Sequence, residues 1–238
     1  MKIQLIGIGV CVVAISGAQT VVPNHRASSD GNSNFFLMVS GTTTRTYQLM
    51  INASQLTGLV NTNLNGLQWR LDAAATAAWP PAGGTISNFE IRMGAGNAPS
   101  TQNINFASNF AGTPTLVRSG ALTFNSGDFA FGGSPNPWGP TIGFSNYLYT
   151  GGHLTVEYRF TGMPTGTPQP NLDASAADTG QGTDYAAMFA TSNSATAGSA
   201  LGGRFVVTRF TGSPVPEPAT MAALGLGVAA LLRRRKKA

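Results

Sequence analysis

Apolar and polar residues alternate one by one in several segments of the chain. The alternation is clearest at 67–72, 88–93 and 153–160. A period of two predicts β-strands that have one buried and one solvent-facing side. Strands are also expected at 45–51, 121–124, 185–190 and 204–210, where short apolar runs occur.

These segments predict an all-β fold. Gly, Pro, Asn and Ser separate them, and no window has the pattern of a long amphipathic helix. We expect an antiparallel two-sheet β-sandwich or jelly roll over residues 35–212, with an antiparallel barrel as the alternative. The polar residues 19–34 are expected to form a flexible lead-in, and 162–183 a long exposed loop.

The N-terminus has the features of a secretory signal peptide. Lys2 is followed by a mostly apolar run at 3–15 and then by small residues that end at Ala18. This pattern predicts export through residues 1–18 and cleavage between Ala18 and Gln19.

The C-terminus has three parts in order, within residues 213–238. A proline-rich motif at 215–220 comes first and is followed by twelve apolar residues at 221–232. These twelve would form a short transmembrane helix of about 18 Å, against a hydrocarbon core of about 30 Å. A basic tail at 233–238 follows, and positive charge of this kind stays on the cytoplasmic side. The motif residues are Val215, Pro216, Glu217 and Pro218, and the basic stop is Arg233, Arg234, Arg235, Lys236 and Lys237.

This tripartite end resembles the PEP-CTERM sorting signal of bacterial surface proteins, with Pro216-Glu217-Pro218 as the namesake motif. The resemblance implies an exosortase-like processing enzyme as a partner. It also implies at least transient anchoring in the membrane, followed by delivery to the cell surface or to a matrix that contains exopolysaccharide. A generic tail anchor is the alternative, and cleavage and retention of the tail both stay open.

The body of the chain resembles, more loosely, a β-rich domain that recurs among PEP-CTERM proteins. The strings that carry this resemblance are Tyr47-Gln48, Trp69-Arg70-Leu71, Ser119-Gly120 and 205–210. It implies no catalytic residues.

Charge argues against a nucleic-acid partner. Only 10% of the residues are charged, and the net charge of +5 comes from the two ends of the chain. Between residues 19 and 216 there are eight Arg and eight acidic residues, which cancel. The body therefore has no basic field to attract phosphate. The single cysteine, Cys11, lies in the predicted signal peptide and excludes a disulfide scaffold.

Catalytic side chains are scarce, and we expect neither a catalytic site nor a cofactor. The histidines are His25 and His153, and no nucleophile elbow is present. His153 and Glu157 are about 13 Å apart along one strand, too far to share a metal or a proton. Three acidic residues are expected on the solvent-facing side of strands, paired with neighbouring arginines. The acids are Asp72, Glu90 and Glu157, and the arginines are Arg70, Arg92 and Arg159.

The loops contain two further candidate binding sites, which have less support from the sequence. Asp173, Asp178 and Asp184 share one loop and could hold Ca²⁺ through carboxylate and carbonyl oxygens, although a solvated loop is the simpler interpretation. Trp69 is expected in the core. Four other aromatic residues are candidates for stacking on sugars, or for plugs that close the ends of the sandwich. They are Trp79, Trp138, Tyr147 and Tyr149.

The sequence thus favours an exported, non-enzymatic surface or matrix protein associated with exopolysaccharide. One alternative is a carbohydrate-active enzyme or lectin-like module, which would need converging carboxylates or exposed aromatic rings. The other is a self-associating structural or adhesion module.

Overall fold

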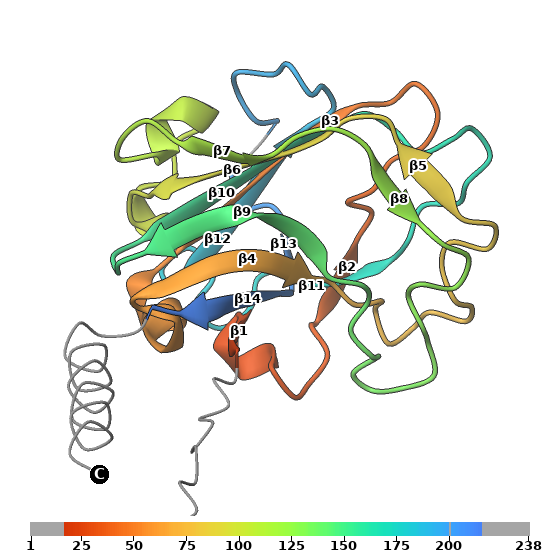
Figure 1. Cartoon of the computed structure of the whole chain (residues 1–238), viewed down its shortest axis with the longest axis horizontal. Coiled ribbons are helices and arrows are strands. Elements are labelled where there is room, and N and C mark those ends of the chain that lie inside the picture. Colours follow the sequence, from red (N-terminus) through yellow and green to blue (C-terminus); the bar gives the residue numbers. More distant parts are fainter. Residues whose placement is uncertain (1–16, 200, 216–238) are drawn as a thin grey trace, which may run out of the picture.

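The computed structural model describes residues 17–199 and 201–215, which form two main antiparallel sheets that pack face to face (Figure 1). The four-stranded sheet has the order β1-β14-β4-β9, and the five-stranded sheet the order β12-β3-β10-β6-β7. Small sheets β13-β11-β2 and β5-β8 lie beside them. The expected all-β sandwich is confirmed.

The elements have the following bounds. In the four-stranded sheet they are β1 Ala18–Val22, β14 Thr208–Pro214, β4 Thr62–Gln68 and β9 Ile142–Tyr149. In the five-stranded sheet they are β12 Tyr185–Ala190, β3 Arg45–Ile51, β10 Leu154–Phe160, β6 Phe89–Ala95 and β7 Thr115–Arg118. The small sheets contain β13 Phe205–Val206, β11 Leu172–Ser175, β2 Ser33–Phe35, β5 Gly84–Ile86 and β8 Leu122–Phe124. Short 3₁₀ helices are η1 Asn24–Arg26, η2 Ala53–Leu59, η3 Pro99–Thr101 and η4 Phe106–Asn109.

One hydrophobic core joins the two main sheets. Trp69, directly after β4, is fully buried and meets Phe89 of β6 and Tyr158 of β10 edge to face. The ring centroids are 6.3 and 5.6 Å apart, within the range that favours such pairs. The prediction that Trp69 is a core residue is confirmed.

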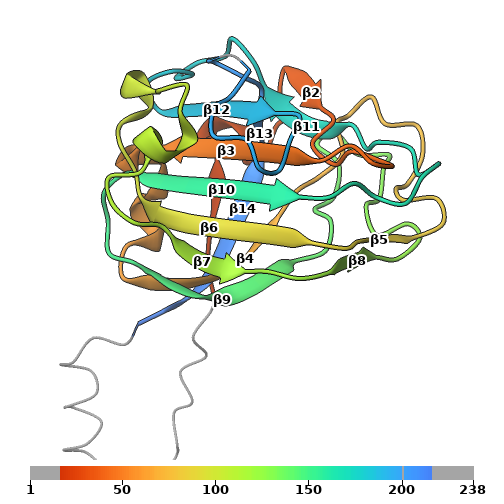
Figure 2. The ribbon, with the colours of Figure 1, turned by 90° about the horizontal axis from the view of Figure 1, so that it is seen from above.

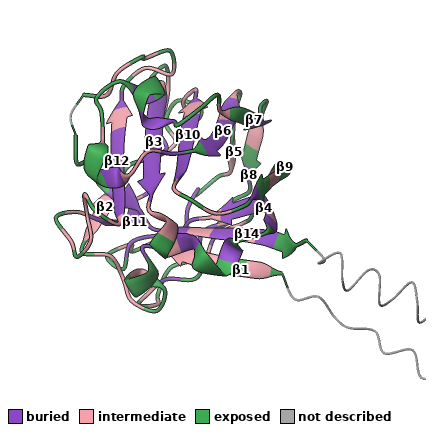
Figure 3. Cartoon of the chain, turned by 90° about the vertical axis from the view of Figure 1, so that its left-hand side faces the viewer, coloured by how far each residue is buried: buried purple, intermediate pink, exposed green. Residues whose placement is uncertain are grey.

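The outer face of the five-stranded sheet differs from the prediction. The inward side of β10 is buried as expected, but Thr155 and Glu157 on its other side are buried as well. The segment that carries η3 and η4 lies over Thr155 and Glu157. Two hydrogen bonds hold it there, one from Gln48 Nε2 to the Phe106 carbonyl and one from Thr155 Oγ1 to the Asn109 carbonyl. Figure 3 shows the buried residues spread through this sheet.

The expectation of a flexible lead-in at 19–34 is wrong. β1 pairs with β14 from Ala18↔Gly212 to Val22↔Thr208, and η1 and β2 follow in the same segment. The β domain therefore runs from Ala18 to Pro214 rather than from 35 to 212. The segment 162–183, expected to be an exposed loop, contains the buried strand β11.

A buried ion pair holds the N-terminal segment against the domain. Arg70 Nε and Asp173 Oδ2 are 2.7 Å apart, and their side chains are 1% and 0% exposed. Arg70 Nη2 also donates to the carbonyls of Arg26 and Ser29, and Asp173 Oδ1 accepts from Gly31 N. A Cβ at Gly31 would lie 2.0 Å from the Ala174 carbonyl oxygen, so this close approach requires glycine. Arg70 was expected on a solvent-facing side, paired with a strand neighbour, and that expectation is wrong.

Asp173→Asn is therefore expected to lower the free energy of unfolding by about 3–5 kcal/mol, because it leaves the Arg70 charge buried without its counter-ion. Glu90→Gln is the matched control, because Glu90 and Arg92 form a pair that is partly exposed. Loss of this partly exposed pair is expected to lower the free energy of unfolding by about 1 kcal/mol or less. Urea unfolding of both variants measures the difference. Equal losses would contradict the role given to the buried pair.

Candidate functional site

The two ends of the described chain lie side by side on the four-stranded sheet (Figure 2). Gln19 of β1 is paired with Thr211 of β14, and β14 is also paired with β4 on its other side. Val215 N donates to the Asn61 carbonyl, 2.9 Å away, so this pairing continues one residue beyond β14. The predicted cleavage bond after Ala18 thus lies in β1, and the proline-rich motif at 215–220 begins directly after the neighbouring strand β14.

Most residues of the predicted address segments lie outside the described part of the chain. These are residues 1–16 of the signal peptide, the motif residues Pro216, Glu217 and Pro218, the expected helix 221–232 and the basic residues 233–237. In the described residues, no helix is long and apolar enough to cross a membrane.

A pocket of about 470 Å³, lined by both charged and apolar residues, opens on the outer face of the five-stranded sheet. Its charged residues are Arg92, Glu157 and Arg159, and Phe110 and Pro114 of the covering segment line its other side. Arg159 Nε donates to Glu157 Oε1 over 2.7 Å. Gln48 Nε2 donates to Glu157 Oε2 over 3.1 Å. Glu157 is therefore fixed from two sides, while the side chains of Arg92 and Arg159 keep 30% and 20% exposure.

Two carboxylates converge beside this pocket. Arg92 Nη2 lies 2.7 Å from Glu90 Oε2, and Arg92 Nη1 lies 3.5 Å from Glu157 Oε1. One guanidinium thus joins both acids, which places them within the roughly 10 Å that glycoside hydrolases use. The guanidinium occupies the space between the two carboxylates, where a substrate would have to bind. The predicted pairing of Glu90 and Glu157 with Arg92 and Arg159 is found, and Asp72 instead caps a turn by accepting from Ala74 N.

The candidate stacking aromatics do not form a platform. Trp79 is 4% exposed and packs against Phe124 and Phe129, and Tyr149 is 2% exposed. Tyr149 OH donates to the Gly152 carbonyl, and burial raises its pKa to about 12. Trp79 and Tyr149 are therefore plugs, which was the second interpretation of these rings.

The other two candidate rings are partly buried. The Trp138 ring lies under two guanidinium groups, 4.8 Å from Arg70 Cζ and 4.7 Å from Arg209 Cζ. This cation–π contact covers the ring that would have met a sugar. Tyr147 lies on β9, where burial raises its pKa.

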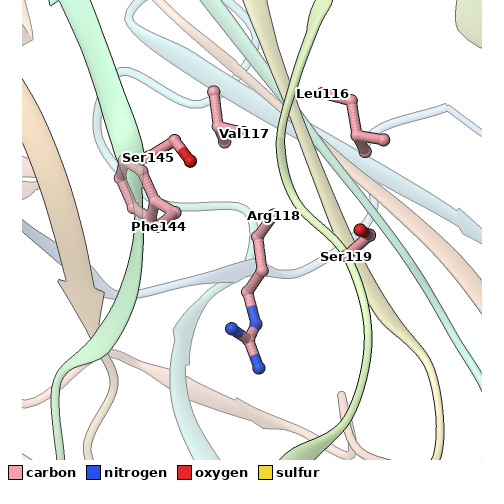
Figure 4. A pocket seen from close by; sticks show the side chains of 6 residues that line it. All are labelled: Leu116, Val117, Arg118, Ser119, Phe144 and Ser145. Atoms are coloured by element: carbon pink, nitrogen blue, oxygen red, sulfur yellow. The ribbon is translucent and has the colours of Figure 1, made fainter.

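A second pocket, of about 310 Å³, lies where the edge strands of the two main sheets adjoin. Figure 4 shows that Phe144 and Ser145 come from β9, while the remaining lining residues come from β7 and its end. Arg118 in this pocket donates to the Ala121 carbonyl, which holds its guanidinium at the rim.

The proposed calcium ligands are not brought together. Asp173 is bound to Arg70, and Asp178 Oδ2 lies 3.0 Å from His25 Nε2 and 2.8 Å from Arg26 Nη2. Within residues 17–199 and 201–215, no group of three or more His, Cys, Asp or Glu residues is placed to hold a metal ion. The carboxylates of Asp173 and Asp178 instead hold η1 and the N-terminal segment in place.

The end of the chain matches one family model, the PEP-CTERM protein-sorting motif, over residues 214–236. This protein carries a PEP-CTERM sorting motif. The PEP-CTERM match begins at Pro214, the last residue of β14, so the folded domain runs into the sorting motif without a linker. Comparison with curated proteins and with solved structures gave no match.

A PEP-CTERM motif is a sorting signal for exosortase-type processing enzymes, and it implies export and sorting to the surface. The sequence pointed to the motif directly, because its proline-rich, apolar and basic parts are contiguous. The pocket that Glu157 lines was only partly predicted from the sequence. The sequence predicted that Arg92, Glu157 and Arg159 form ion pairs. It did not indicate that the segment carrying η3 and η4 would cover the strands on which they lie.

The pKa of Asp178 lies well below its usual value. Burial alone would raise it, but hydrogen bonds from His25, Arg26 and Thr179 N outweigh that effect. A depressed folded-state pKa adds stability above the unfolded value, near 4, and this contribution is lost as the pH falls below it. Asp178→Asn should therefore be less stable than the unmodified protein at pH 7, and the difference should shrink steadily below about pH 4. Urea unfolding from pH 7 to pH 2 measures it, and a constant difference would refute the assignment.

Proposed function

We propose that this protein is a non-enzymatic component of the bacterial surface or extracellular matrix that binds exopolysaccharide. The observation that carries the proposal is the PEP-CTERM motif joined directly to the last strand of a folded β domain. The domain is exported and sorted as one unit, so its function belongs outside the cytoplasm.

The pocket beside Glu157 supports a polysaccharide ligand. Guanidinium and carboxylate groups form paired hydrogen bonds with vicinal hydroxyls, and Arg92 and Arg159 both retain exposed surface there. The volume of about 470 Å³ lies within the range of small-ligand sites. The near-zero charge of residues 19–216 avoids long-range repulsion from either neutral or acidic polysaccharides.

A carbohydrate-active enzyme is the second candidate, and the convergence of Glu90 and Glu157 favours it. A general acid and a nucleophile or base need free access to the glycosidic bond between them. Arg92 lies between these two carboxylates and pairs with both, which favours a binding role over hydrolysis.

Arg92→Ala is expected to weaken polysaccharide binding about tenfold or more, because hydrogen bonds to a charged group contribute about 1.5–3 kcal/mol. The control is Arg118→Ala, an arginine of the other pocket. The full chain would be titrated calorimetrically with a neutral glucan, a polyuronate and the exopolysaccharide of the bacterium that expresses the protein. Unfolding midpoints confirm that both variants fold.

Three results would overturn the proposal. The first is no saturable binding to any of the three polysaccharides, and the second is equal weakening in both variants. The third is release of reducing ends that Glu90→Gln abolishes, which would establish the enzyme instead. Mass that rises with protein concentration in light scattering, without polysaccharide binding, would favour a self-associating module.

A further inference from the structure

The strands and connections that form the end of the four-stranded sheet, where the described chain begins and ends, contain no charged residue. This end is built from β1, from η2 with most of β4, from β9 with its following turn, and from the last residues of β14. The corresponding segments 17–22, 53–66, 142–152 and 210–215 contain no Asp, Glu, Lys or Arg. Other surfaces of the domain carry charge, such as the outer face of the five-stranded sheet with Glu90, Arg92 and Arg159.

This uncharged end also exposes large aliphatic side chains. Val60 is 45% exposed, Leu148 51% and Val215 39%. Leu148 is paired with Asn63, which is paired in turn with Ser213 on β14. Side chains two residues apart on a strand share a face, so Val215 lies on the same side of the sheet as Ser213 and Leu148. Val60 precedes Asn61, whose carbonyl accepts from Val215 N. Val60 and Val215 thus lie near the point where the chain leaves β14, and Leu148 lies two strands away in the same sheet.

The short distance along the chain between this end of the sheet and the sorting segment indicates that a membrane lies close to it. The apolar run begins at Met221, six residues after Val215. Six extended residues span at most about 20 Å, so a membrane that holds this run lies within that distance of the sheet end. The predicted signal peptide ends at Ala18, which is paired with Gly212 of β14. The start of the domain and the start of the sorting segment therefore lie at the same end of the sheet.

We propose that this end of the sheet rests on the lipid headgroup layer while the sorting segment is in the membrane, with Val60, Leu148 and Val215 at the apolar boundary. Uncharged amide, hydroxyl and aliphatic groups lose little when they leave bulk water for this layer, whereas charged side chains lose much more. Three aliphatic side chains are too few to hold a free domain on a bilayer. The short tether raises their effective concentration at the membrane, and so keeps the domain in this orientation.

The contact also gives the sheet end a role in sorting. It would keep the proline-rich motif at the membrane surface, where a membrane-embedded processing enzyme acts, and it would orient the rest of the domain away from the lipid. The proposal concerns orientation at the membrane, and it is independent of any polysaccharide bound at the pocket beside Glu157.

The chain is suited to a direct test, because Cys11 is its only cysteine. Full-length protein with Cys11→Ser would be reconstituted into vesicles of phosphatidylethanolamine and phosphatidylglycerol. A single cysteine would be introduced by Leu148→Cys or Val60→Cys and labelled with an environment-sensitive fluorophore. Phe131→Cys is the matched control. Phe131 is 48% exposed and lies before the start of β9, whereas Leu148 lies near its end. Unfolding midpoints confirm that each labelled variant folds.

Quenchers attached to the lipid headgroups are expected to quench the labels at 148 and 60 about threefold or more strongly than the label at 131, because interfacial contact brings a group within about 5–10 Å of the headgroups. Equal quenching at all three positions, or stronger quenching at 131, would overturn the proposal. So would a chain that does not float with the vesicles, since the tether would then be absent. Polysaccharide titration without lipid is unaffected by any of these outcomes, so the two proposals fail separately.

Discussion

Strand β14 is the constraint on which the rest of the arrangement depends. It is hydrogen-bonded to β1 on one side and to β4 on the other, and Phe210 in its middle is fully buried in the core. A strand paired on both sides exposes no free edge, and its amides open only when the sheet itself opens. The sorting motif begins at the last residue of this strand. A processing enzyme that acts on the motif therefore acts on a segment attached to a strand that is paired on both sides.

The pairing of β1 with β14 also imposes an order of events. The predicted cleavage bond between Ala18 and Gln19 lies inside β1, which is hydrogen-bonded to β14. A peptidase that binds its substrate as an extended strand needs that backbone unpaired. Cleavage at the predicted bond would therefore have to precede docking of β1 onto β14. The four-stranded sheet would then be completed only after that cleavage.

The sequence predicted those features that depend on residues close together in the chain. The alternation in 88–93 placed Phe89, Ile91 and Met93 inside, because one strand and the face of one sheet determine that pattern. It failed for Glu157, which is buried by a segment whose contacts with β10 come from distant positions. It failed also for Arg70, whose counter-ion Asp173 lies 103 residues away.

The candidate sites also divide into features that are contiguous in the sequence, which were predicted, and features that depend on distant residues, which were not. The sorting motif is a contiguous string and was recognised whole. The aromatic hypothesis required rings from separate segments to converge, and the calcium hypothesis required three carboxylates of one loop to face a common point. The fold instead placed Trp138 under two arginines and Asp178 against His25 and Arg26. β1 was missed because five residues beside a cleavage site carry little strand signal, and their partner lies at the other end of the domain.

The most direct test of this account is amide hydrogen exchange along β14 in the full chain, followed by mass spectrometry. Pairing on both sides predicts that the amides of 209–212 exchange as slowly as those of the central strand β10, and much more slowly than those of the singly paired edge strand β7. Fast exchange throughout 209–212, at the rate of β7 or above, would mean that the sorting motif is not attached to a constrained strand, and it would contradict the account.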